Sequence, residues 1–211
     1  EEPTGNLLIS DPRVDAVILT GATATAQHFL KLRPHLPLFA ETGGKNSIII
    51  SNMADQDQAI SHLITSSFSH SGQKCSACSL AILHKELYDD PKFLLTLKEA
   101  AASLPVGPQT DLATRIGPLI KPPQGSLLKA LTELEAGEQW LLKGRSISPD
   151  LWSPAIKLCS QIDPIERFGP ILCVVRAENL DHAIALANST PYGLTAGIQS
   201  LDDREIERWR Q

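Results

Sequence analysis

Two side chains in this sequence have the chemistry needed for oxidative attack on an aldehyde. Cys75 stands in the segment GQKCSACS, before an apolar run that predicts a strand, and Glu41 stands in the segment ETGGKN. A thiolate adds to an aldehyde carbon, a hydride leaves, and a thioester remains. A carboxylate can then deprotonate the water that hydrolyses the thioester. Cys75 and Glu41 are therefore candidates for nucleophile and base.

An isolated cysteine is usually inert and buried, and the neighbours of Cys75 strengthen the case for a reactive thiol without deciding it. Gly72 interrupts the chain after an apolar helix, Lys74 adds a positive charge, and the small Ser76 and Ala77 leave room beside the sulfur. If the first turn after Cys75 is helical, its free N–H groups favour the thiolate and can stabilise an oxyanion.

Cys78 forms a CxxC pair with Cys75, a spacing that dithiol redox proteins and zinc sites also use. The sequence has no second CxxC and no histidine pair at ligand spacing, so we expect no metal. A redox pair stays open as an alternative, although a packing role for Cys78 is favoured.

Glu41 precedes a very apolar stretch, Ser47–Ser51, which predicts a buried strand. A carboxylate at the mouth of such a strand is expected to be partly buried, which raises its pKa toward the range of a general base. A third segment, ERFGP, supplies the carboxylate of Glu166 and the ring of Phe168. Such a carboxylate can accept hydrogen bonds from two hydroxyls, although Gly169–Pro170 also reads as an ordinary surface turn.

Apolar stretches along the chain alternate between strand and helix patterns. We expect strands at 14–19, 47–51, 80–84, 171–175 and 193–199, and helices at 22–32, 55–68, 91–103, 126–136, 181–188 and 202–211. Strands separated by helices predict an α/β fold with a mainly parallel, twisted sheet and helices on both faces. Residues 105–125, rich in proline and glycine, predict a surface connection.

Composition narrows the range of functions. With 211 residues, 42% of them hydrophobic, the chain can bury a proper core. Its 19 basic and 24 acidic side chains give a charge of −5 without a basic cluster, so neither nucleic acid nor an anionic membrane is an expected partner. Every apolar run is far shorter than the roughly 20 residues of a membrane span.

Four cysteines are too few and too scattered for a disulfide scaffold, which favours a reducing, intracellular setting. Cys159 and Cys173 each lie in apolar runs and are interpreted as small core residues.

The segments ETGGKN, GQKCSACS and ERFGP, in this order, resemble the aldehyde dehydrogenase superfamily. GQKCSACS is most similar to the branch that oxidises glutamate 5-semialdehyde, the 1-pyrroline-5-carboxylate dehydrogenases, including the dehydrogenase part of bifunctional proline-utilisation proteins. The stretches LPVGPQTDLATRIGPLI and NSTPYGLTAG extend the resemblance to nearly the whole chain, from about Asp11 to Trp209.

The resemblance implies a Rossmann-like fold, NAD as cofactor and an aldehyde as substrate. It implies that Cys75 attacks, that Ser76 lies next to the aldehyde carbon, and that Glu41 activates water. For the nicotinamide end of NAD it implies contacts with Gly21, Thr42, Gly43, Glu166 and Phe168. A cytoplasmic location, or the mitochondrial matrix in a eukaryote, and a homo-oligomer are expected, with fusion to a proline dehydrogenase domain as one arrangement.

Members of this family are more than twice as long, so the chain resembles an excised catalytic portion. Residues 1–40 are interpreted as the end of an NAD-binding domain and 41–211 as the catalytic domain. Alone, the polypeptide is expected to bind NAD poorly and turn over slowly. The alternatives are another aldehyde substrate, a coenzyme A thioester product, a non-catalytic scaffold, or a CxxC redox module.

Overall fold

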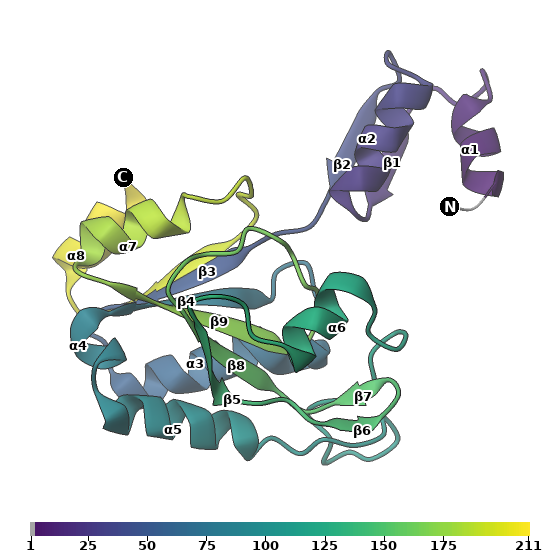
Figure 1. Cartoon of the computed structure of the whole chain (residues 1–211). Coiled ribbons are helices and arrows are strands. Elements are labelled where there is room, and N and C mark those ends of the chain that lie inside the picture. The colour runs from purple at the N-terminus through teal and green to yellow at the C-terminus, as the bar shows by residue number, and fades with distance from the viewer. Residues whose placement is uncertain (1–2) are drawn as a thin grey trace. The chain divides into compact units, whose positions relative to one another are not determined.

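The computed structural model describes residues 3–211 and divides the chain into two compact units, Glu1–Gly43 and Gly44–Gln211. In the first unit, parallel strands β1 and β2 are connected by helix α2, and α1 precedes them (Figure 1). The bounds are Pro3–Ser10 for α1, Val17–Thr20 for β1, Thr23–Leu32 for α2 and Leu38–Glu41 for β2. Helix α2 lies where it was predicted, whereas α1 and β2 were not predicted.

The second unit is built on a six-stranded sheet in the order β10-β3-β4-β9-β8-β5. All neighbouring pairs are parallel except β5 and β8, which run antiparallel. The bounds are Asn46–Ile50 for β3, Cys78–His84 for β4, Glu138–Leu142 for β5, Ala155–Cys159 for β8, Ile171–Ala177 for β9 and Ala196–Gln199 for β10. A two-stranded ribbon of β6 and β7 adds Ser146–Ser148 and Leu151–Trp152.

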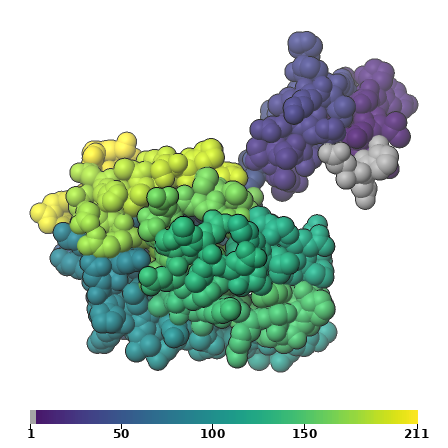
Figure 2. Space-filling model, viewed as in Figure 1, coloured from purple at the N-terminus to yellow at the C-terminus, as the bar shows by residue number. Residues whose placement is uncertain are grey.

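Helices cover both faces of this sheet, which confirms the predicted α/β class (Figure 1). Segments far apart in sequence share one packed surface in the second unit (Figure 2). The helices are α3 (Gln56–Phe68), η1 (Ser69–Gly72), α4 (Lys85–Tyr88), α5 (Pro91–Ala102), α6 (Gly125–Thr132), α7 (Leu180–Ala187) and α8 (Asp203–Arg210).

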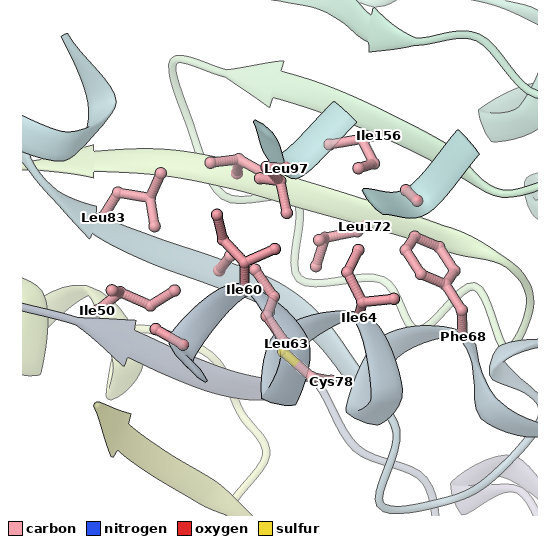
Figure 3. Close-up of a cluster of buried hydrophobic side chains, with 14 of the residues drawn as sticks. Ile50, Ile60, Leu63, Ile64, Phe68, Cys78, Leu83, Leu97, Ile156 and Leu172 are labelled. Carbon is pink, nitrogen blue, oxygen red and sulfur yellow. The ribbon is translucent and has the colours of Figure 1, made fainter. Parts of the chain in front are cut away.

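The period-2 alternation of β4 divides its side chains between two cores. Ala81 and Leu83 pack with α3 and α5 on one face, and Leu80 and Ile82 pack with α7 on the other. Figure 3 shows the first of these cores, where Leu63 of α3 faces the sheet. Asp55 caps α3 by accepting a hydrogen bond from the N–H of Gln58, which fixes the start of that helix.

Truncating Leu63 to alanine is expected to lower the free energy of unfolding by about 2–5 kcal/mol. Leu63 is fully buried, so the change removes apolar contacts and leaves a cavity. Leu95→Ala on α5 is the matched control because Leu95 is largely exposed, and it should cost less than about 1 kcal/mol. Urea unfolding measures both variants, and equal losses would contradict this account of the core.

The segment 105–125 was predicted to be a surface connection, but it also contributes side chains to the core. Ile116 and Leu119 are buried, and Val106 pairs with Ile116 in an isolated parallel bridge. The segment lacks an apolar period because only these few positions enter the core.

Cys159 and Cys173 lie on the neighbouring strands β8 and β9, with their Cα atoms 6.2 Å apart. Both belong to the core beneath α7, as predicted. The structure joins their sulfur atoms in a disulfide, so the interpretation of each as a separate core thiol is wrong. The pairing depends on β8, a strand that the sequence pattern did not reveal.

Residues 3–211 offer neither a membrane span nor a clustered metal site. None of the helices there combines the length and apolar composition that a bilayer crossing requires. Within the same residues, His, Cys, Asp and Glu side chains form no group of three that could hold a metal ion.

Candidate active site

Cys75 lies in a tight turn between η1 and β4, and its side chain is exposed. The N–H of Ala77 closes this turn by donating to the carbonyl of Lys74 at 2.9 Å. The chain enters β4 directly at Cys78, so the condition of a helical turn after Cys75 is not met. The sulfur therefore lacks the free N–H groups and the dipole that such a helical turn would have supplied.

The backbone just before Cys75 adopts an unusual left-handed conformation. His70, Ser71 and Gly72 have φ values of 54°, 56° and 67°. At Gly72 a Cβ atom would overlap the carbonyl oxygen of Gly169, well inside 3.0 Å. Only glycine fits there, because the segment before Cys75 packs directly on the ERFGP loop. Strained backbone of this kind is often concentrated at functional sites.

Side-chain hydrogen bonds hold the same segment from two sides. Ser71 Oγ donates to the carbonyl of Gly117 at 2.6 Å. Gln73 Nε2 donates to the carbonyl of Phe168 at 3.2 Å, and Gln73 Oε1 accepts from the N–H of Ile120 at 2.9 Å. Gln73 thus connects the cysteine turn, the ERFGP loop and the 105–125 segment. Sequence reasoning missed this role because it depends on partners distant in the chain.

The ERFGP loop is fixed against the start of β3. Glu166 Oε1 accepts a hydrogen bond from the N–H of Gly44 at 2.9 Å, and Lys45 Nζ donates to the carbonyl of Ile165 at 3.2 Å. Phe168 is exposed and has a φ of 49°. Burial lowers the pKa of the Lys45 ammonium, which lies beneath this loop.

A small pocket gathers parts of all three motifs within the second unit. Its lining includes Gly44, Lys74, Glu166 and Phe168. Ser76, predicted to lie near the aldehyde carbon, is half-buried in the adjoining turn. The structure thus brings the cysteine turn, the start of β3 and the ERFGP loop together.

Cys78 has a very different environment from Cys75. It is buried in the core beside Leu63, and its Sγ donates to the carbonyl of Leu80 at 3.3 Å (Figure 3). Burial raises the pKa of the Cys78 thiol to about 11, so the thiol stays neutral near pH 7. Cys75 and Cys78 are both free. One exposed and one buried thiol argue against the CxxC redox module.

This raised pKa predicts a specific dependence of stability on pH. The ordinary thiol pKa of 9.0 applies to the unfolded chain, and the folded value is about 11. As pH rises from 9 to 11 the unfolded state loses this proton first, so stability falls by up to roughly 3 kcal/mol. Cys78→Ala lacks this contribution. Urea unfolding of the original chain and of Cys78→Ala at pH 8 and pH 10.5 measures this difference. Equal losses of stability in the two proteins would contradict the prediction.

Glu41 and Gly21 lie together at the end of the first unit's sheet. Glu41 is the last residue of β2 and pairs with Thr20, and its carbonyl accepts from the N–H of Gly21 at 3.1 Å. The Glu41 side chain is exposed, so its predicted partial burial is wrong. The prediction placed Glu41 at the mouth of β3, whereas it ends a strand of its own. Thr42 and Gly43, predicted to meet the cofactor, follow it in the same unit.

Glu41 and Cys75 belong to different units, so their pairing as base and nucleophile stays a prediction.

Known proteins are similar to this chain along its whole length. A model of the aldehyde dehydrogenase family matches residues 1–211. The chain belongs to the aldehyde dehydrogenase family. This confirms the resemblance that the three motifs carried.

Among curated aldehyde dehydrogenases, the chain is 32% identical over 224 residues to 1-pyrroline-5-carboxylate dehydrogenase of Geobacillus thermodenitrificans. That match covers 98% of this chain and 42% of the relative, so the chain spans about two fifths of its length. Proline Utilization A from Corynebacterium freiburgense matches with 43% identity and a TM-score of 0.93, covering 100% of this chain and 22% of that one.

The structure of a third similar protein was solved with a dinucleotide. The NADP-dependent glyceraldehyde-3-phosphate dehydrogenase from Bacillus halodurans, complexed with NADP, is 27% identical with a TM-score of 0.87. The match covers 99% of this chain and 44% of that one. The fold of this aldehyde dehydrogenase chain is thus shared by relatives whose names give different substrates.

Proposed function

We propose that the protein is an NAD-dependent aldehyde dehydrogenase that oxidises glutamate 5-semialdehyde to glutamate in proline breakdown. The observation that carries the proposal is the exposed Cys75, held in a fixed turn against the Glu166–Phe168 loop. The likeness to 1-pyrroline-5-carboxylate dehydrogenases and Proline Utilization A supports the choice of substrate.

The proposed reaction begins with attack of the Cys75 thiolate on the aldehyde carbon, forming a C–S bond. Loss of hydride from this adduct gives a thioester on Cys75. Glu41 takes a proton from water, the resulting hydroxide attacks the thioester carbon, and the thiolate leaves as the acid forms. Within residues 3–211 the N–H groups of Cys75 and Ser76 donate no hydrogen bond, so they are available to an oxyanion.

The residues present fit the nicotinamide end of NAD, which would accept the hydride. Glu166 uses Oε1 for the N–H of Gly44, and Oε2 has no donor among residues 3–211. That oxygen can accept hydrogen bonds from ribose hydroxyls. Phe168 offers an exposed ring beside it, and Gly21, Thr42 and Gly43 would supply contacts from the first unit.

The proposal extends to the organisation of the whole protein. Residues 1–40 would be the end of the NAD-binding domain and 41–211 the thiol-bearing catalytic domain. A homo-oligomer in the cytoplasm, or in the mitochondrial matrix of a eukaryote, is proposed. The likeness to Proline Utilization A supports fusion to a proline dehydrogenase domain as one arrangement.

The activity is tested by following NAD reduction by the whole protein with glutamate 5-semialdehyde. We expect kcat/KM at least about 10-fold above that for lactaldehyde or benzaldehyde, because glutamate 5-semialdehyde carries charged groups that those aldehydes lack, and a site built to bind such groups would reject aldehydes without them. Chromatography should find free glutamate rather than a coenzyme A thioester. Absence of NAD reduction with every aldehyde would refute the proposal, and NADP in place of NAD would correct the cofactor.

The alternative is that the protein is a non-catalytic scaffold. The rate at which Cys75 is alkylated distinguishes this scaffold from the proposed enzyme. Brief treatment of the 211-residue chain with iodoacetamide should label Cys75 at least about 100-fold faster than Cys78, because Cys75 is exposed whereas the Cys78 thiol is buried and kept neutral by its raised pKa. The alkylation rate of Cys75 is then compared with that of a small free thiol, which decides whether Cys75 is an activated nucleophile. A scaffold predicts that Cys75 reacts no faster than this reference, whereas an activated nucleophile exceeds it. Peptide mass spectrometry measures both rates.

A further inference from the structure

Asn46, the first residue of β3, makes three hydrogen bonds through a buried side chain. Only 4% of it is exposed. Its Nδ2 donates to the carbonyl of Cys75 at 2.7 Å and to the carbonyl of Ala77 at 2.9 Å. Its Oδ1 accepts from the N–H of Thr195 at 3.1 Å. A neutral carboxamide is suited to this place because it offers two donors and an acceptor.

These bonds fix the backbone on both sides of Ser76. A peptide group is planar, so holding the carbonyl of Cys75 also sets the direction of the Ser76 N–H. Holding the carbonyl of Ala77 sets the point at which the chain enters β4. Asn46 therefore determines how the turn presents the Cys75 sulfur and the N–H beside it.

Gly44, two residues before Asn46, explains why the Asn46 amide has little freedom to move. A Cβ atom at Gly44 would lie 2.7 Å from Asn46 Oδ1, so the amide packs against the Gly44 backbone. The N–H of Gly44 in turn donates to Glu166. The start of β3 thus contacts both the cysteine turn and the ERFGP loop.

We propose that Asn46 is a positioning residue for the nucleophile: its amide holds the turn that carries Cys75. It acts through the backbone, because all three of its side-chain hydrogen bonds are to main-chain groups. The effect of Asn46 on catalysis rests on the proposed aldehyde dehydrogenase function. Its effect on the structure of the turn is independent of that function.

Three variants separate the local role from general stability. Asn46→Asp keeps the size and the acceptor for Thr195 but removes both donors. Asn46→Ala removes all three bonds. Ser51→Ala is the control: Ser51 follows the other end of β3, is equally buried, and bonds to Glu205 rather than to the turn. If both Asn46 variants fail to fold, Gly44→Ala displaces the amide and replaces them.

Fluorine NMR of a trifluoromethyl label on Cys75 tests the turn in the 211-residue chain, without any need for activity. The original chain and Ser51→Ala should each give one narrow resonance. In the Asn46 variants the resonance should be shifted and either broadened or split. Thermal unfolding of the same variants should show that they are folded. An unchanged signal in a folded Asn46 variant would overturn the proposal.

Kinetics of the whole protein supply the second measurement. Asn46→Asp should lower kcat by at least about 10-fold while KM for NAD changes less than about 2-fold, because the nucleophile moves and the cofactor contacts remain. An altered NMR signal with an unchanged kcat would also overturn the positioning role. If the original protein oxidises no aldehyde, the proposed function fails, and the NMR result still decides whether Asn46 holds the turn.

Discussion

Replacing Cys75 with serine is expected to lower kcat of the whole protein for aldehyde oxidation by at least about 1,000-fold. The sulfur is the exposed thiol of the cysteine turn, and a serine hydroxyl without an adjacent base is a far weaker nucleophile. The change is nearly isosteric and the side chain is exposed, so the fold should survive. NAD reduction under saturating substrate measures the loss, and the melting temperature confirms that the variant is folded.

Cys78→Ala is the matched control because it removes the other free thiol from the same segment. That sulfur lies in the core, and burial keeps it neutral. The variant should lose about 1–2 kcal/mol of stability through lost packing but keep kcat within about 3-fold. Comparable losses of kcat in the two variants would contradict a single nucleophile, and full activity of Cys75→Ser would exclude the mechanism.

The parts of the fold that were predictable are those with a clear apolar period. Helices α3 and α5 and strands β3, β4 and β9 lie within two residues of their predicted positions, because each buries a continuous face. Strands β2, β5, β6, β7 and β8 were missed. In β5, EQWLL mixes charge with apolar residues, and the strand is mostly half-buried at the sheet edge. Such strands carry little alternation, and tertiary pairing alone defines them.

The candidate site was predictable only where a residue's own chemistry marks it. Cys75 and Glu166 could be selected as a thiol and a carboxylate, and their segments do lie side by side. Asn46 and Gln73 could not be selected, because an amide becomes important only through partners elsewhere in the chain. The burial of Glu41 was misjudged because the intervening strand β2 was not predicted.

Replacing Gly72 with alanine is expected to lower the free energy of unfolding by about 2–4 kcal/mol. Two costs add: a φ of +67° is unfavourable by roughly 1–2 kcal/mol for a residue with a Cβ, and that Cβ would overlap the Gly169 carbonyl. Leu127, which is buried, packs closely on Gly169 from the α6 side: a Cβ at Gly169 would lie 2.5 Å from Leu127 Cδ1. The strain must therefore move one loop or the other.

Gly193→Ala is the control for this change, since its added methyl meets nothing within 4 Å. We expect it to alter stability by less than about 1 kcal/mol. Urea unfolding compares the two, and similar stabilities would show that the cysteine turn and the ERFGP loop do not restrain each other. If they do, Gly72→Ala should also weaken NAD binding to the whole protein. The displaced Gly169 is covalently joined to Phe168 and lies three residues from Glu166, so strain that begins beside the nucleophile reaches the groups proposed to hold the cofactor.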